Sequence, residues 1–133
     1  MSNTTPAQGN PHHRNVDRAP YELGFLLKSL PAGFNGFQRA TPDTLQIADS
    51  AARHAYIASS TVLCGIEAIG ACLSSAIIGA DVPIEAAHVR GLAELIQHLA
   101  VEAQFLQETH VELGDALRRH AERFGAGESG KVG

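Results

Sequence analysis

Two long segments of the chain repeat apolar residues in alternating steps of three and four. The first seam runs through Leu45, Ala48, Ala52, Ala55, Ser59, Val62, Ile66, Ile69, Leu73 and Ala76. The second runs through Leu92, Ile96, Leu99, Ala103, Leu106, His110, Leu113, Leu117, His120 and Phe124. Steps of three and four return to one face of a helix. The pattern therefore predicts two long amphipathic helices, over 42–79 and from about 83 to 124.

Residues with capping preferences lie at the ends of both predicted helices. Thr41 is suited to cap the first helix, and Pro42 suits its first helical position. Gly79 is suited to end that helix, while Pro83 and Glu85 fit the first turn of the second. Because the connection is short, the two helices must run antiparallel as a hairpin. The fold class predicted is all-α.

A separate apolar segment over 20–40 carries most of the aromatic side chains: Tyr21, Phe25, Phe34 and Phe37. A short helix is expected from Tyr21 to Leu30, after which Pro31 and two glycines break it. The segment is too short to fold alone. It is either a lid packed on the domain or a hook for another protein, and the four aromatic residues are candidates for partner binding.

The first long helix is apolar on three sides. From His54 to the end of the helix its one charged residue is Glu67. A single partner helix covers one side and the aromatic segment a second. The third side carries Ile57, Cys64, Ala71 and Ile78. A second copy of the chain is the simplest cover for it, so these residues are expected to form a homodimer interface in a four-helix arrangement.

The second long helix has mostly polar outward positions, with one exception. Val101 and Phe105 lie four residues apart on its outward side. An exposed apolar pair on an otherwise polar face marks a contact, so these two residues join the partner-binding candidates.

Composition narrows the class of function. The chain has 133 residues, 44% of them hydrophobic, with 14 Asp and Glu against 10 Lys and Arg, a net charge of -4. This leaves no surplus of positive charge for binding nucleic acid. A membrane span is disfavoured because Glu67 falls near the middle of the apolar stretch, and the next helix is rich in carboxylates. Polar tails are expected to be disordered over 1–19 and 125–133, around a single helical domain at 20–124.

No pattern points to a catalytic residue, a metal or a cofactor. Cys64 and Cys72 lie about 12 Å apart along one helix, too far for a disulfide, and are expected to be small buried apolar residues. Glu94, His98 and Glu102 step by four along the solvated side, which does not make a ligand set. His110 and His120 fall on the seam and are expected to be satisfied core or interface histidines. With no apolar leader segment at its start, the chain is expected in the cytoplasm.

The stretch AIGACLSSAIIGADVPIEAAHVRGLAELIQHLAVEAQFL resembles the small, Ala-rich helical-hairpin proteins of Gram-negative bacteria. Among them, the chain is most similar to the quorum-sensing antiactivators. The resemblance implies a cytoplasmic protein that binds the ligand-binding domain of a LuxR-type transcriptional receptor. It also implies that the protein masks the receptor's dimerisation surface and lowers its occupancy of DNA.

Two hypotheses of different classes follow. The first is a dimeric, protein-binding negative regulator that blocks the dimerisation and DNA binding of a transcriptional regulator. The second is a structural or assembly protein, such as a granule-surface or phage component, whose broad apolar helix lies on a lattice or lipid-like surface. Defined oligomers favour the first, and open-ended assembly favours the second.

Overall fold

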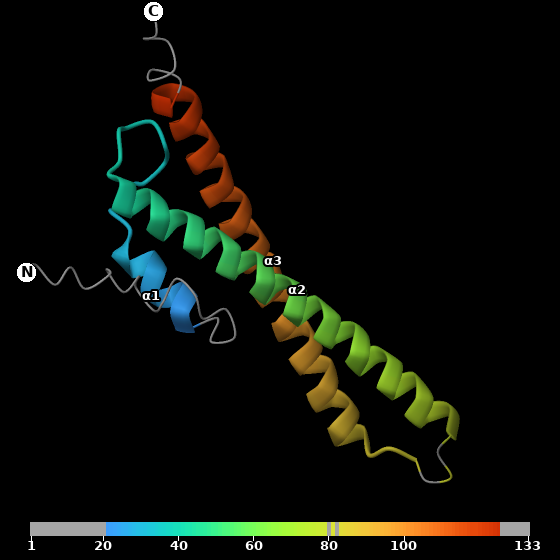
Figure 1. Ribbon diagram of the computed structural model, residues 1–133. Helices are drawn as coiled ribbons and strands as arrows, with labels where there is room; N and C mark the ends of the chain where they lie inside the picture. Colours follow the sequence, from blue (N-terminus) through green and yellow to red (C-terminus); the bar gives the residue numbers. More distant parts are fainter. Residues whose placement is uncertain (1–20, 80, 82, 126–133) are drawn as a thin grey trace, which may run out of the picture.

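The computed structural model of the chain describes residues 21–79, 81 and 83–125. The described residues form three helices: α1 (Tyr21–Ser29), α2 (Pro42–Gly79) and α3 (Ala86–Phe124). The two long helices form a hairpin, and α1 packs against α2 (Figure 1). This confirms the predicted all-α hairpin with a short N-terminal helix. Of the predicted tails 1–19 and 125–133, only Gly125 lies within the described residues, and its N–H donates to the carbonyl of Ala121 at the end of α3.

The predicted seams are the surfaces by which α2 and α3 meet. The fully buried seam residues are Ala48, Ala52, Ala55 and Ser59 on α2, with Ala103, Leu106, Leu113 and His120 on α3. Small alanines on α2 face larger side chains on α3, which lets the two helices pack closely. The heptad-like pattern therefore identified the interface between the long helices correctly.

The start of α2 agrees with the sequence pattern, and the start of α3 differs from it. The Thr44 N–H donates to the Thr41 hydroxyl over 3.2 Å, as expected of a capping residue. The prediction that the second helix begins near Pro83 is wrong, because α3 begins at Ala86. Glu85 has an extended ψ of 135°, and its carbonyl accepts the first helical bonds from the N–H groups of His88 and Val89. Helix geometry therefore cannot continue back through Glu85.

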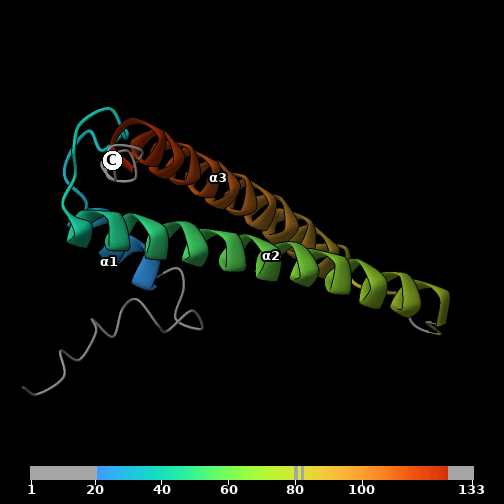
Figure 2. The same ribbon diagram turned by 45° about the horizontal axis from the view of Figure 1, so that its top comes forward.

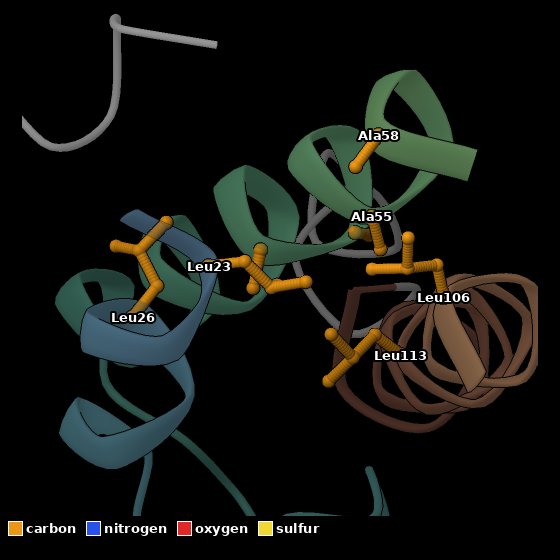
Figure 3. Close-up of a cluster of buried hydrophobic side chains, with 8 residues drawn as sticks. Leu23, Leu26, Ala55, Ala58, Leu106 and Leu113 are labelled. Carbon is orange, nitrogen blue, oxygen red and sulfur yellow. The ribbon is translucent and has the colours of Figure 1, made fainter. Parts of the chain in front are cut away.

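The hydrophobic core lies where all three helices meet. Leu23 and Leu26 of α1 and Leu106 and Leu113 of α3 approach α2 from different sides (Figure 3). The α2 surface between them is made of small residues: Ala51, Ala52, Ala55 and Ala58. A nine-residue helix is held in place by two leucine side chains seated on this alanine surface.

The loop between α1 and α2 is fastened to the end of α3. The Ala40 N–H donates to Nε2 of His120 over 3.0 Å, and the Arg119 guanidinium donates to the carbonyl of Asn35. Gly36 lies against the backbone of Ala116. Figure 2 shows this loop at the end of the molecule where α2 starts and α3 finishes.

Burial is confined to one end of the hairpin. The buried residues of α2 lie between Ala48 and Ser59, and those of α3 between Ala103 and His120. We call the remaining part, residues 60–79 of α2 and 86–102 of α3, the arm. Among the three described helices, α2 and α3 pack only against each other in the arm, because α1 lies beside the first half of α2 (Figure 1).

Candidate interaction surface

The aromatic segment docks through its leucines, leaving aromatic side chains at the surface. Leu23 and Leu26 are buried, whereas Phe25 on the same helix is 41% exposed. Phe34 is half-buried and packs against the core. Tyr21 begins α1, and its side chain lies outside what the structure describes. The segment covers α2 as a lid does, and the partner-binding role of its aromatic residues stays a prediction.

Phe37 is held at the surface by a cation. Its ring is half exposed, and the Arg119 guanidinium carbon lies 4.4 Å from the ring centroid. Since Arg119 also bonds to the carbonyl of Asn35, the ring and the loop are fixed to α3 together. Phe37 therefore presents an ordered apolar edge at the loop end of the molecule.

The pair Val101 and Phe105 is exposed on α3, as its heptad positions predicted. The two side chains are 68% and 55% exposed. They share one face of the helix because they lie four residues apart. Thr109, one turn further along, is buried, and its hydroxyl donates to the carbonyl of Phe105 over 2.8 Å. The pair thus lies beside the covered part of the molecule without being covered itself.

The side of α2 turned away from both α1 and α3 is here called the outward face. Its centre is a line of residues seven apart: Gln46, Arg53, Ser60, Glu67 and Ser74. Apolar residues flank this line on both sides: Tyr56 and Leu63 on one, and Ile57, Cys64, Ala71 and Ile78 on the other. All six flanking residues are exposed, with Ile78 at 87%. The four predicted dimer-interface residues therefore share one accessible strip.

The expectation that the two cysteines are buried is wrong. Cys64 and Cys72 are both exposed free thiols. Both lie off the seam in the arm, where α3 is the one described helix that packs against α2. An apolar composition does not bury a residue when no third element reaches it.

The outward face carries three charged residues: Asp49, Arg53 and Glu67. Arg53 pairs with Asp49 one turn earlier, with 2.7 Å between guanidinium nitrogen and carboxylate oxygen, and both side chains are more than half exposed. Glu67 is exposed and makes no ion pair within the described part of the chain. The face therefore presents the Asp49–Arg53 ion pair near its start and the Glu67 carboxylate fourteen residues after Arg53.

Two open grooves lie between the long helices. The larger, of about 850 Å³, lies where α2 starts and α3 ends, and it is lined by Pro42, Leu45, Leu117, Phe124 and their neighbours. The smaller, of about 390 Å³, is formed by Arg53, Tyr56, Ile57 and His110 and has a nearly apolar lining. The rings of Tyr56 and His110 lie 5.2 Å apart in that groove. It borders the outward face of α2 and enlarges its apolar surface.

Sequence reasoning missed a group of buried polar residues where α1 meets α2. Glu22, Ser50 and His54 are each no more than 2% exposed. Their helical positions lie beside Leu23 and Ala51, which mark the contact between the two helices. The pattern gave no signal for this burial, because the direction in which α1 packs on α2 is a tertiary property.

Among the described residues, no cluster of three His, Cys, Asp or Glu side chains is arranged to hold a metal ion. One helix, α2, is long and apolar enough to cross a membrane by length and composition, and none of its most apolar window is buried. The core helix of a soluble protein also passes this test of length and composition but is mostly buried, so a single such helix is weak evidence for a membrane span. The distinctive feature of the molecule is therefore an exposed apolar surface on helices.

Comparisons of the chain with protein families, with characterised proteins and with solved structures find no match.

Proposed function

We propose that this chain is a protein-binding negative regulator, which binds a LuxR-type transcriptional receptor and blocks its dimerisation and DNA binding. The observation that carries the proposal is the exposed apolar pair Val101 and Phe105 on α3. The choice of receptor rests on the resemblance of residues 20–124, in size and helix pattern, to quorum-sensing antiactivators.

The pair has the chemistry of an interface anchor. Binding energy at protein interfaces concentrates in a few well-packed side chains, with aromatic residues prominent among them. A helical face with apolar residues four apart fits the groove or helix pair of another protein. Phe25 and Phe37, which are 41% and 50% exposed, offer further aromatic surface on α1 and on the loop.

The charge of the chain supports contact with the receptor protein rather than with its operator. A net charge of -4 opposes approach to DNA phosphates. A dimeric receptor places its two recognition helices in two half-sites, so a monomeric receptor loses half of its contacts to DNA. Covering the receptor's dimerisation surface is therefore sufficient to release it from the operator.

A second candidate, a structural or assembly component, is favoured by the length and exposed apolar surface of α2. In that case the chain forms open-ended assemblies, or binds granules, through the arm. The two candidates differ in stoichiometry, since a regulator forms a complex of fixed composition with its receptor.

The test is co-purification of the full chain with the isolated ligand-binding domain of the receptor, followed by a gel shift on the operator. We expect the domain to be retained. We also expect added chain to release the receptor from DNA without forming a band of its own. Failure to retain either the domain or the full receptor would contradict the proposal, and growth of the chain into large assemblies would then favour the structural candidate.

The first prediction is that Phe105→Glu weakens receptor binding at least tenfold, about 1.4 kcal/mol, because it places a charge in a desolvated contact. Helical circular dichroism and the unfolding midpoint are expected to change little, within about 0.5 kcal/mol, as for an exposed site. Gln97→Glu is the matched control, since it adds the same charge to another exposed position of α3. Equal weakening by both variants, or unfolding of the first, would refute an anchor role for Phe105.

A further inference from the structure

We propose that a second copy of this chain packs antiparallel on the outward face of α2, with Ser60 at the two-fold axis. In this arrangement Arg53 of each copy lies opposite Glu67 of the other. The inference goes beyond the proposed regulatory function, because it assigns a second surface. The receptor is proposed to bind Val101 and Phe105 on α3, whereas the second copy is proposed to bind the outward face of α2.

The outward face is free to accept another helix. The seam of α2 faces α3, and Ala51 and Ala58 belong to the core that includes α1. Successive residues turn by about 100° around a helix, so the line through Arg53, Ser60 and Glu67 points away from both neighbours. Because Ser60 is small, a second helix can approach closely at the centre of this line.

The two charges fix the register of the pairing. Ser60 lies midway between Arg53 and Glu67, seven residues from each. In an antiparallel two-fold pairing about Ser60, each of these charges meets its opposite in the second copy. A pairing centred on either charged residue instead places like charges against each other, which is unfavourable.

The same register places apolar residues against apolar residues. Ile57 comes opposite Leu63 of the second copy, and Tyr56 comes opposite Cys64 of the second copy. Each pairing occurs twice by symmetry, which is how a two-fold interface uses one patch on both subunits. All four residues are exposed in the single chain, so their burial requires no rearrangement of the hairpin.

Other covers for this face fit its chemistry less well. The segments outside the described residues, 1–20 and 126–133, are polar, with Val16 and Val132 as their only branched aliphatic residues. A bilayer would receive Glu67 near the middle of the apolar stretch, where a carboxylate is costly. A second copy supplies Arg53 as a partner for that carboxylate.

The size of the contact sets the concentration at which it forms. Residues 46 to 74 extend over about 42 Å of helix, and a strip about 10 Å wide gives a footprint of roughly 400 Å² per copy. The total of about 800 Å² is below the range of specific stable interfaces and falls among weak, transient contacts. We therefore expect a reversible dimer in the micromolar range rather than a permanent one.

The experiment is a charge swap followed by light scattering after size exclusion, over low to high micromolar concentrations. The full chain is expected to reach twice its mass of 14.0 kDa. Arg53→Glu and Glu67→Arg alone are each expected to give the monomer mass at the same concentrations, because each sets like charges against one another. The double variant is expected to regain the dimer. A full chain that stays monomeric, or a dimer that neither single change weakens, would overturn the proposal.

A cross-linking measurement keeps the test decisive if a charge variant unfolds. With Cys64 and Cys72 replaced by serine, Ser60→Cys is expected to form covalent dimers with a short bifunctional maleimide. Ser74→Cys is the control, since position 74 lies opposite position 46 of the second copy and far from its own symmetry mate. Equal cross-linking at both positions would contradict the register. The full chain can also be tested for flotation with vesicles of phosphatidylethanolamine and phosphatidylglycerol. If it floats with these vesicles and forms no dimer without them, the outward face binds a membrane and not a second copy.

Discussion

Gly36 is the residue at which the loop between α1 and α2 comes closest to α3. Its φ is +81°, a backbone conformation that costs a residue with a Cβ atom about 1–2 kcal/mol. A Cβ atom at this position would lie 2.0 Å from the carbonyl oxygen of Ala116. Neither atom can move far, because one belongs to the backbone of α3 and the other would belong to a loop fastened at Asn35 and Ala40.

We therefore predict that Gly36→Ala destabilises the protein by about 2–4 kcal/mol, combining backbone strain with displacement of the loop. Gly33→Ala is the matched control. It has a similar φ of +77° but no atom within 4 Å of the added Cβ, so it should lose only about 1–2 kcal/mol. Urea unfolding followed by circular dichroism measures both, and equal losses would show that the contact with Ala116 is unimportant.

The two seam histidines have the satisfied roles that their positions predicted. His120 is buried, and its Nε2 accepts the N–H of Ala40. His110 places Nδ1 3.0 Å from the carbonyl of Ala52 on the facing helix. A leucine at position 120 would therefore leave the Ala40 N–H without this acceptor. The Ala52 carbonyl lies within α2, so the contact with His110 adds to its helical hydrogen bond.

At the scale of elements, α1 is stable only because it is docked. Nine residues are too few for an isolated helix in water. Leu26 is completely buried, so we predict that Leu26→Ala costs about 2–5 kcal/mol through lost contacts and the cavity left behind. Val111→Ala is the control and should change stability by no more than about 0.5 kcal/mol, since Val111 is exposed on α3 and belongs to no proposed interface. Thermal unfolding compares the two, and similar melting temperatures would show that α1 is not part of the cooperative core.

The elements themselves were largely predictable from sequence, because their signals are local. Steps of three and four, with Thr41 and Gly79 at the ends, gave the bounds of α2 correctly. The start of α3 was placed too early, since Pro83 is compatible with a first turn but does not require one. The exposure of Cys72 was not predictable, because it depends on how far along α2 the short helix α1 reaches.

Candidate surface residues were predictable to the same degree. Exposure of Val101 and Phe105 followed from heptad positions on an otherwise amphipathic helix. Burial of aromatic side chains in the 20–40 segment was harder to predict than the exposure of this pair. Leucines of the same short helix fill the core positions, and Phe25 lies at the surface. Which residues of a mixed apolar segment face the core depends on its docking direction.

For the whole molecule, the most apolar stretch of the chain is also the least buried. The far half of α2 holds no fully buried residue among those described, while the core is built at the other end of the hairpin. The proposed second copy would cover the outward face of this helix and leave Val101 and Phe105 on α3 exposed. The proposed dimer would then carry two copies of the proposed partner-binding surface.

The most direct test of this account is the alkylation rate of the two native cysteines as the chain concentration rises. Cys64 flanks the outward face, whereas Cys72, eight residues further, is turned by about 80° away from it. Both thiols are exposed in the single chain. The account predicts that Cys64 becomes several-fold slower to react with a maleimide as the dimer forms, while Cys72 keeps its rate. Unchanged reactivity of Cys64 across the micromolar range, or equal protection of both thiols, would contradict it.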